Sequence, residues 1–428
     1  MSAPTGTGTG WVSERFGVRL DGDGVTELVR LGLRRNPKRA HLLVSTVLGK
    51  HIPTDPVRVR GAADRLADLV VELIGAEKSA AATVLGFAET ATGLGHCVAD
   101  RMGAACYLHS TRRRADGVSV TATFEEGHSH ATTHLIEPTD DALFAPDSPD
   151  TDVPLVLVDD EISTGATALE AIAALHAQYP RRSYVAAALV DMRDAAQQQQ
   201  CEAEADRLGL SVTFVALAHG SIGLPSGFTE QVCALAAPEL NPVGPVPGSV
   251  TIVRAPWPTG VPDGGRHGFL RADTASFEEA TAAVTAAVRE RLDPAVAVVV
   301  VGHEEFMYQP LCVAEHLAQD GFTVRYQTST RSPAFVLDEP GYPLRRGFEF
   351  PAPEGDTTAK RYLYNAVLDP TDPAGSQVVF VCDEPAGTDD LYRAGGLVDV
   401  LTRAGHNVVV AVVDTPSQQS LRTAREAR

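Results

Sequence analysis

The chain has 428 residues, more than one ordinary hydrophobic core accommodates, so its length predicts two domains. Hydrophobic residues make up 44% and charged residues 21%, a composition typical of folded, soluble proteins that excludes a disordered chain. The formal net charge of −19 disfavours nonspecific binding to nucleic acid or to an anionic membrane.

Cysteine usage and apolar runs indicate a cellular location. The six cysteines show no Cys-x-x-Cys spacing, which favours a reducing compartment. The first residues lack the basic and then apolar pattern of a secretion signal, and the apolar run 295–301 is too short to cross a bilayer. We therefore expect a cytoplasmic protein that is not inserted in a membrane.

The first half of the chain alternates predicted helices and strands. A Gly/Thr-rich tail over residues 1–10 precedes a helix predicted at 25–34 and a strand predicted at 41–48. Lys50 and His51 follow this strand and could contact an acceptor substrate, or could belong to a solvated loop. The next predicted elements are helices at 60–73 and up to residue 98, strands at 81–87, 104–108 and 155–158, and a helix at 166–177.

The stretch 155–167 reads Leu-Val-Leu-Val-Asp-Asp-Glu-Ile-Ser-Thr-Gly-Ala-Thr and carries the main motif. Its four apolar residues predict a buried strand that ends in Asp159 and Asp160. A glycine turn at the start of a helix can bind phosphate through unpaired backbone N–H groups. The two carboxylates suit a ribose diol, directly or through a divalent cation. The alternative is an ordinary strand with an acidic end and a Ser/Thr helix cap.

This stretch resembles the phosphoribosyl pyrophosphate (PRPP) signature of the type I phosphoribosyltransferases. The resemblance implies that Asp159 and Asp160 bind the ribose hydroxyls and hold Mg²⁺ largely through PRPP. It assigns the 5′-phosphate to Ser163, Thr164, Gly165, Ala166 and Thr167. Ser163 stands where purine-specific members often have an aspartate, which weakens the case for a purine acceptor.

The same resemblance implies a pyrophosphate site. By position, the family's pyrophosphate loop corresponds to Ala88, Glu89 and Thr90. The strand at 104–108 leads to three consecutive arginines, Arg112, Arg113 and Arg114, whose planar donors suit a diphosphate. A solvated surface cluster is the alternative for these arginines.

The segment 121–134 corresponds to the mobile hood that closes over PRPP in this family. Its polar residues could transfer protons or exclude water: Glu125, Glu126, His128 and His130. A zinc site is the alternative, although the spacing lacks the helical register of a zinc enzyme.

Further strands are predicted at 184–190 and 211–217, and this regular alternation predicts a parallel α/β sheet. Asp191 and Arg193 follow the first of them and could contact the acceptor or form a structural ion pair. The Pro/Gly-rich stretch 238–265 predicts a linker between a phosphoribosyltransferase domain at 11–237 and a second domain at 266–428.

The second domain is also predicted to be α/β and Rossmann-like. Helices are expected at 276–292, 311–319 and 391–403, and strands at 295–301, 323–327, 378–382 and 407–413. Its predicted site residues are Glu304, Glu305, Tyr308, Thr330, Arg331 and Ser332. These residues resemble the TRSP domain that is fused behind phosphoribosyltransferase domains in bacterial tellurium-resistance and stress gene clusters, which are thought to make a nucleoside-like metabolite. Arg331 beside two hydroxyls suggests an anion contact, and a structural arginine that closes a loop is the alternative.

The sequence therefore predicts a Mg²⁺-dependent transferase that moves phosphoribosyl from PRPP to a nucleobase-like nitrogen acceptor. Two rivals are a noncatalytic PRPP-binding regulator and a metal-dependent phosphate-ester hydrolase that uses the C-terminal carboxylates. A regulator could dispense with the arginines and the hood, and both are present. The sequence leaves the acceptor open, and whether the protein is a homodimer.

Overall fold

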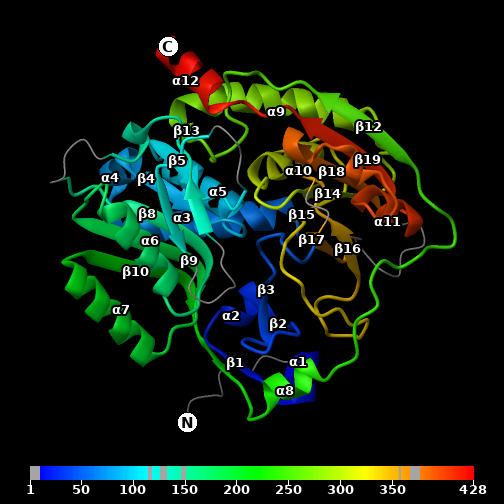
Figure 1. Ribbon diagram of the computed structural model, residues 1–428, viewed down its shortest axis with the longest axis horizontal. Helices are drawn as coiled ribbons and strands as arrows, with labels where there is room; N and C mark the ends of the chain where they lie inside the picture. Colours follow the sequence, from blue (N-terminus) through cyan, green and yellow to red (C-terminus); the bar gives the residue numbers. More distant parts are fainter. Residues whose placement is uncertain (1–9, 114–117, 126–132, 146–150, 356–357, 367–375) are drawn as a thin grey trace. The chain divides into compact units, whose positions relative to one another are not determined.

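The computed structural model describes residues 10–113, 118–125, 133–145, 151–355, 358–366 and 376–428 (Figure 1). The chain divides into two compact units. Unit 1 comprises Met1–Val59, Ile222–Trp257 and Glu279–Thr415, and unit 2 comprises Arg60–Ser221, Pro258–Glu278 and Pro416–Arg428. No helix among the described residues is long and apolar enough to span a bilayer.

Unit 2 is built on a six-stranded sheet. Its strands are, in spatial order, β10 (Ser211–His219), β9 (Ser183–Asp191), β8 (Leu155–Ile162), β4 (Thr83–Gly86), β5 (Cys106–His109) and β13 (Phe269–Leu270). All neighbouring pairs are parallel except β5 and β13. Parallel strands are covered on both faces, which explains the continuous apolar runs in the sequence. The parallel α/β sheet predicted for this part is confirmed.

Helices and a hairpin complete unit 2. They are α3 (Pro56–Ile74, whose first four residues belong to unit 1), α4 (Ala76–Ala81), α5 (Thr92–Met102), α6 (Ala166–His176), α7 (Ala195–Leu208), α12 (Gln418–Glu426), and the antiparallel pair β6 (Ala122–Glu125) and β7 (Thr133–Ile136). Short 3₁₀ turns lie at Asp141–Leu143 and Arg271–Asp273. α5 packs closely on the sheet, since a Cβ on Gly95 would lie 3.0 Å from the Cα of Gly86.

Unit 1 holds a parallel five-stranded sheet. Its order is β12 (Val250–Ala255), β19 (Asn407–Val413), β18 (Gln377–Asp383), β14 (Val298–Gly302) and β15 (Val324–Thr328). The chain leaves β14 toward β15 on one side and later returns to β18 on the other. Such a reversal opens a crevice at the carboxyl ends of the strands, where α/β proteins usually bind ligands.

The remaining elements of unit 1 cover this sheet or form small additions. They are α9 (Thr274–Arg289, which crosses the division between the units), α10 (Tyr308–Gln319), α11 (Leu397–Arg403), the hairpin β16 (Gly347–Pro351) and β17 (Lys360–Tyr364), and the short elements α1 (Trp11–Phe16), β1 (Arg19–Asp21), α2 (Val25–Leu28), β2 (Val29–Leu33), β3 (His41–Ser45), β11 (Ser221–Gly223) and α8 (Phe228–Cys233), with 3₁₀ turns at Glu384–Ala386 and Asp389–Leu391. One core packs β16, β17 and α11 against β14, β18 and β19.

Two local predictions differ from the structure. The helix predicted at 25–34 is only α2, followed by β2, because Val29, Leu31 and Leu33 alternate as a strand and pair with β3. The predicted linker 238–265 contains β12, an edge strand that pairs with β19. Val250, Ile252 and Arg254 of β12 are exposed, so this strand lacks the continuous buried apolar run by which the others were predicted.

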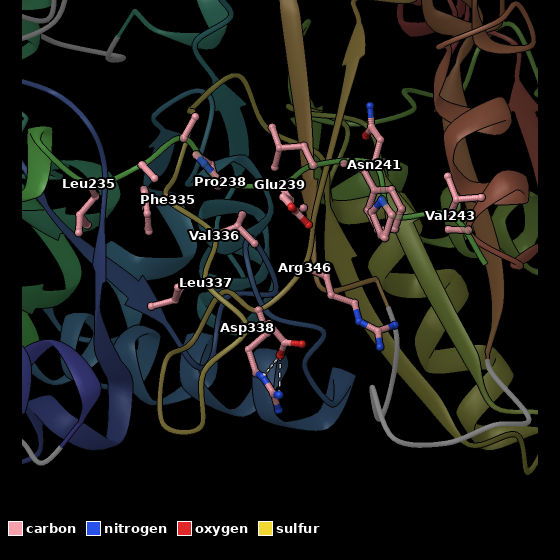
Figure 2. A pocket seen from close by; sticks show the side chains of 18 of the residues that line it. Leu235, Pro238, Glu239, Asn241, Val243, Phe335, Val336, Leu337, Asp338 and Arg346 are labelled. Atoms are coloured by element: carbon pink, nitrogen blue, oxygen red, sulfur yellow. Dashed lines mark hydrogen bonds and ion pairs between the residues drawn. The ribbon is translucent and has the colours of Figure 1, made fainter. Parts of the chain in front are cut away.

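A cavity of about 1120 Å³ lies in unit 1 beside this Pro-rich stretch (Figure 2). Its walls come from residues 235–245 and from the segment before β16, including Phe335, Val336 and Leu337. Arg345 Nε donates a hydrogen bond of 2.7 Å to Asp338 Oδ1 at its edge. Among the described residues, none that was predicted to form a site lines this cavity.

Candidate functional site

Three acidic residues follow one another at the end of β8. β8 pairs with β4 only as far as Val158 and Gly86, whereas its pairing with β9 continues to the strand's end. Asp159 therefore lies beyond its last β4 neighbour and is only half-buried. Side chains alternate along a strand, so Asp159 and Glu161 share one side and Asp160 takes the other. Asp159 Oδ1 accepts a hydrogen bond of 2.8 Å from the Asp160 backbone N, which orients this carboxylate.

The turn after β8 forms the wall of a small hollow. Gly165 has φ of +82° immediately before α6, a conformation that favours glycine. A Cβ there would lie 2.5 Å from Cys201 Sγ. Thr164 Oγ1 accepts a hydrogen bond of 3.3 Å from Ala166 N at the start of α6. The hollow is lined by Phe87, Leu157, Asp159, Glu161, Ile162, Ser163, Thr164, Gly165, Thr167, Ala168, Ala186 and Ala187.

This hollow combines two kinds of binding group. The first turn of α6 and the hydroxyls before it can donate hydrogen bonds to an anion. The carboxylates of Asp159 and Glu161 can accept hydrogen bonds from hydroxyls or coordinate a hard cation. A phosphorylated sugar with free hydroxyls satisfies both requirements.

Asp191 and Arg193 form an ion pair behind this turn. Arg193 Nη2 lies 2.7 Å from Asp191 Oδ2, and both side chains are buried. The guanidinium stacks on Phe214 at 3.7 Å, and its Cδ lies 3.2 Å from where a Gly165 Cβ would be. Burial acts to lower the Arg193 pKa, but Asp191 and Cys201 together outweigh it and the pKa is raised. The pair thus supports the turn, and its predicted contact with an acceptor stays a prediction.

The loop after β4 lies beside β8. Ala88 and Glu89 are buried, the peptide bond between them is cis, and Thr90 is half-buried. Ala88 N donates a hydrogen bond of 2.9 Å to Ser110 Oγ, the residue that follows β5. The loop and the end of β5 are therefore tied together.

The arginines that follow β5 are half-buried rather than fully solvated. Arg112 Nη2 lies 3.3 Å from His134 Nε2, and Arg113 N donates to Thr111 Oγ1 at 3.1 Å. Arg114, the third of the predicted arginines, lies outside the described residues.

The predicted hood begins and ends as the β6–β7 hairpin. Glu125, at the end of β6, is exposed and accepts a hydrogen bond of 3.1 Å from Thr133 Oγ1. Glu126, His128 and His130 lie outside the described residues. Their predicted roles stay predictions.

Lys50 and His51 belong to unit 1. His51 is buried, packs against Tyr364, and accepts a hydrogen bond of 3.1 Å from Asn365 Nδ2 at its carbonyl oxygen. Burial and the neighbouring Lys50 hold the His51 pKa well below its ordinary value. Neither residue is in a solvated loop, since Lys50 is half-buried.

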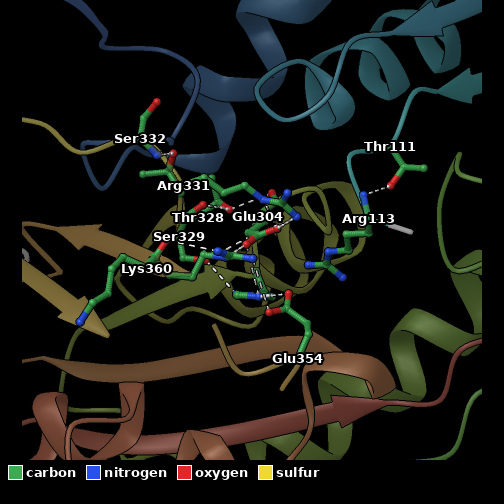
Figure 3. A network of polar contacts seen from close by, with 12 residues as sticks. Thr111, Arg113, Glu304, Thr328, Ser329, Arg331, Ser332, Glu354 and Lys360 are labelled. Carbon is green, nitrogen blue, oxygen red and sulfur yellow. Dashed lines mark hydrogen bonds and ion pairs between the residues drawn. The ribbon is translucent and has the colours of Figure 1, made fainter. Parts of the chain in front are cut away.

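A second polar cluster lies at the carboxyl ends of β14 and β15 in unit 1 (Figure 3). Glu304 is fully buried and has φ of +51°, an uncommon conformation for a residue other than glycine. Arg331 donates to Glu304 Oε2 through Nε at 2.9 Å and Nη2 at 2.7 Å. Arg361 Nε forms an ion pair with the other oxygen of Glu304.

His303 extends this cluster. Its Nδ1 lies 2.9 Å from Ser329 Oγ and its Nε2 lies 2.9 Å from Glu354 Oε1. Glu354 also lies 3.6 Å from Arg361 Nη2. The other residues predicted for this site are buried or half-buried around it: Glu305, Tyr308, Thr330 and Ser332.

His303, Glu304 and Glu354 bring a histidine nitrogen and two carboxylate groups close together. Among the described residues, they form the group that could hold a metal ion. Two guanidinium groups already neutralise Glu304, however, and a cation beside them would be repelled. Arg331 closes the loop onto Glu304, as expected of a structural arginine. Its predicted contact with an anion stays a prediction.

Comparison with protein families matches both parts of the chain. A family described as phosphoribosyl transferase matches residues 28–221, and one described as the TRSP domain on its C-terminal side matches residues 263–401. The chain thus joins a domain of the phosphoribosyltransferase family to a TRSP domain on its C-terminal side. The predicted recognition is confirmed. Residues 28–59 of the phosphoribosyltransferase match lie in unit 1, and the rest lie in unit 2.

Solved structures similar to this chain include adenine phosphoribosyltransferases. The enzyme from Trypanosoma brucei, in complex with AMP, pyrophosphate and ribose-5-phosphate, shares 14% identity over 45% of this chain and 77% of its own, with a TM-score of 0.32. The Rhodothermus marinus enzyme shares 18% over 45% and 96% (TM-score 0.31), and the Giardia lamblia enzyme with 9-deazaadenine shares 15% over 44% and 94% (TM-score 0.31). A comparison with curated proteins gives no match.

Several residues of these clusters were missed by the sequence analysis as site residues. In the phosphoribosyltransferase domain, Ser110 and His134 link the loop after β4 to Arg112. In the TRSP domain, His303 and Glu354 complete the cluster around Glu304. A His immediately after a buried strand was the available signal for His303, whereas nothing in the surrounding sequence distinguishes Glu354.

Proposed function

We propose that this protein is a PRPP-dependent phosphoribosyltransferase that transfers the 5-phosphoribosyl group to a nitrogen nucleophile and releases pyrophosphate. The observation that carries the proposal is the hollow at the end of β8, where half-buried Asp159 and Glu161 border the Gly165 turn. The turn and the α6 N-terminus suit the 5′-phosphate, and the neighbouring carboxylates suit the ribose hydroxyls.

The loop of Ala88, Glu89 and Thr90, with Arg112 and Arg113, would hold the pyrophosphate. Both segments follow strands adjacent to each other in the sheet, β4 and β5, so they end at the same edge. In the reaction, the bond from ribose C1 to the pyrophosphate oxygen breaks and its electron pair leaves with pyrophosphate. A bond from C1 to the acceptor nitrogen forms, and that nitrogen loses its proton to solvent.

Magnesium fits the donor set proposed here. On one side of β8, Asp159 and Glu161 offer partly exposed carboxylate oxygens, the ligands that hard cations prefer, whereas Asp160, predicted to hold the ion with Asp159, takes the other side of the strand. When bound with PRPP, the ion would neutralise charge on the leaving pyrophosphate. We propose a nucleobase-like heterocycle as the acceptor, on the basis of the reaction type alone.

The test is pyrophosphate release from PRPP with Mg²⁺ and a panel of heterocyclic bases. We expect release only with a matching base, and we expect Asp159→Asn to lower kcat/KM by roughly 100-fold, ~2.7 kcal/mol. Asp206→Asn, on the exposed side of α7, removes the same charge elsewhere in unit 2 and should leave the rate unchanged.

The same assay separates the two rivals. A regulator would bind PRPP without turnover, and a hydrolase would release phosphate without a base. The hydrolase requires the TRSP-domain carboxylates as metal ligands, and the pairing of Glu304 with Arg331 and Arg361 argues against it.

A further inference from the structure

Ser110 and His134 lie between the two segments proposed to hold pyrophosphate. Ser110 immediately follows β5, and His134 is the second residue of β7. Both are almost fully buried, at 0% and 1% exposure, so neither is in a position to touch a substrate directly.

The hydrogen bonds form a chain with a defined direction. Arg112 Nη2 can only donate, so His134 Nε2 is its acceptor at 3.3 Å. The proton of the neutral imidazole then lies on Nδ1 and is donated to Ser110 Oγ at 2.8 Å. The same oxygen accepts the Ala88 N–H at 2.9 Å. Arg112, His134, Ser110 and the loop are thereby linked.

Packing holds the imidazole in place. His134 stacks on Phe124 of β6 with ring centroids 4.5 Å apart and an interplanar angle of 18°. Thr111 and Leu135 exchange two backbone hydrogen bonds of 2.8 Å, which anchor β7 beside the end of β5. The imidazole therefore has little freedom to leave Ser110 or Arg112.

We propose that Ser110 and His134 are positioning residues that set the geometry of the pyrophosphate site. This inference rests on the proposed function, since it assumes that the Ala88–Thr90 loop and Arg112 bind the leaving group. Ser110 fixes the direction of the loop backbone, and His134 fixes the guanidinium of Arg112. Loss of these hydrogen bonds should weaken pyrophosphate binding and leave the 5′-phosphate turn unchanged.

Three substitutions of His134, made in the full-length protein, separate the contributions of its two hydrogen bonds. His134→Asn places an amide near the position of Nδ1 and can retain the Ser110 bond, whereas His134→Gln places one near Nε2 and can retain the Arg112 bond. His134→Phe keeps the stacking on Phe124 and removes both bonds. Ser110→Ala removes the same link through a smaller change.

Calorimetric titration with inorganic pyrophosphate plus Mg²⁺, and separately with ribose 5-phosphate, provides the readout. We expect His134→Phe and Ser110→Ala to bind pyrophosphate about tenfold more weakly, ~1.4 kcal/mol. The Asn and Gln variants should each lose less than the Phe variant. Affinity for ribose 5-phosphate should stay within about twofold in every variant, because that contact lies at the β8 turn.

Two results would overturn the inference. One is pyrophosphate affinity equal to that of the wild type in both His134→Phe and Ser110→Ala. The other is an equal loss of both ligands, which would indicate a general structural defect. If the wild type itself binds neither ligand, the proposed function fails instead, so the two failures are distinguishable.

Discussion

Gly165 determines whether the turn after β8 can form. Alanine at φ of +82° costs roughly 1–2 kcal/mol, and its Cβ would also lie 2.5 Å from Cys201 Sγ. We expect Gly165→Ala to lower the free energy of unfolding and to weaken ribose 5-phosphate binding, measured by urea denaturation and calorimetry. Gly209→Ala is the matched control, because Gly209 has φ of +70° and no neighbour within 4 Å of a Cβ. Equal binding by the two variants would contradict this expectation.

Glu304 is the residue on which the TRSP-domain cluster depends. Glu304→Ala would leave Arg331 and the buried Arg361 without their shared carboxylate, at a cost of about 3–5 kcal/mol. Relief of the left-handed backbone would not occur, because alanine also disfavours φ of +51°. Urea unfolding should show the loss.

The control for this variant is Glu349→Gln. Glu349 and Lys360 form a partly exposed pair at 3.0 Å, so its removal should change stability by less than about 1 kcal/mol. A Glu304→Ala protein as stable as this control would show that the two arginines find other partners.

At the residue scale, the local structure of the candidate site could be predicted where it lies in one continuous stretch, and the binding roles of these residues stay predictions. The run from Asp159 to Thr167 could be predicted because strand, acids and turn follow one another. His134 could not, since it meets Ser110 only through the pairing of β7 with the end of β5. Asp191 and Arg193 lie close together in the sequence, yet the sequence did not show whether they bind a ligand or pair with each other.

At the scale of elements, the packing of α5 on the sheet encloses a titratable group. His96 of α5 stacks on Tyr107 of β5 at 4.5 Å and meets Phe269 of β13 at 4.5 Å. Burial first, and then the charges of His109 and Arg60, hold its pKa well below the ordinary 6.5. The folded chain therefore keeps His96 neutral in acid, whereas the unfolded chain protonates it.

This difference makes stability depend on pH. The unfolded chain binds the extra proton. The contribution of His96 to the free energy of unfolding is therefore complete above about pH 6.5 and decreases as the pH falls, by up to about 1.4 kcal/mol per pH unit. We expect His96→Phe to make the decline between pH 6.5 and 5 shallower in urea titrations. Tyr107→Phe alters the same packing without removing the histidine and should retain the wild-type slope. A wild-type slope in His96→Phe would contradict the assignment.

Element prediction followed the strength of the apolar pattern. The buried runs of β8 and β14 were predicted, because both faces of these strands are covered. β12 and β2 were not: the first is a largely exposed edge strand, and the second contains apolar spacings that also fit a helix. Strand pairing decides both structures: β12 pairs with β19, far away in the sequence, and β2 pairs with the next strand, β3.

At the scale of the molecule, unit 2 includes α12, which lies far along the chain from most of its partners. Gln418 Nε2 donates to the Glu137 carbonyl at 3.0 Å, Arg422 Nη2 to that of Thr139 at 2.6 Å, and Arg425 Nη2 to that of Gly268 at 2.6 Å. The predicted boundary at 238–265 did not foresee that the C-terminal segment 416–428 belongs to unit 2, because the local composition gives no sign of it.

Removal of residues 416–428 should therefore destabilise unit 2. We expect the unfolding temperature to fall by roughly 5 °C or more, followed by calorimetry. Glu426→Gln, on the exposed side of α12, should have no such effect. A truncated chain that melts with the wild type would show that these hydrogen bonds contribute little.

The order in which the segments are joined has a consequence during translation. Unit 1 takes residues as late as Thr415, and unit 2 takes residues from Pro416 onward. Unit 1 cannot complete its sheet before β19 has been made, and unit 2 cannot add α12 before that, so apolar strands of the unit 1 sheet lack their partner until late in synthesis. Chaperone dependence during synthesis, and poor recovery of prematurely terminated chains, are what this connectivity leads us to expect.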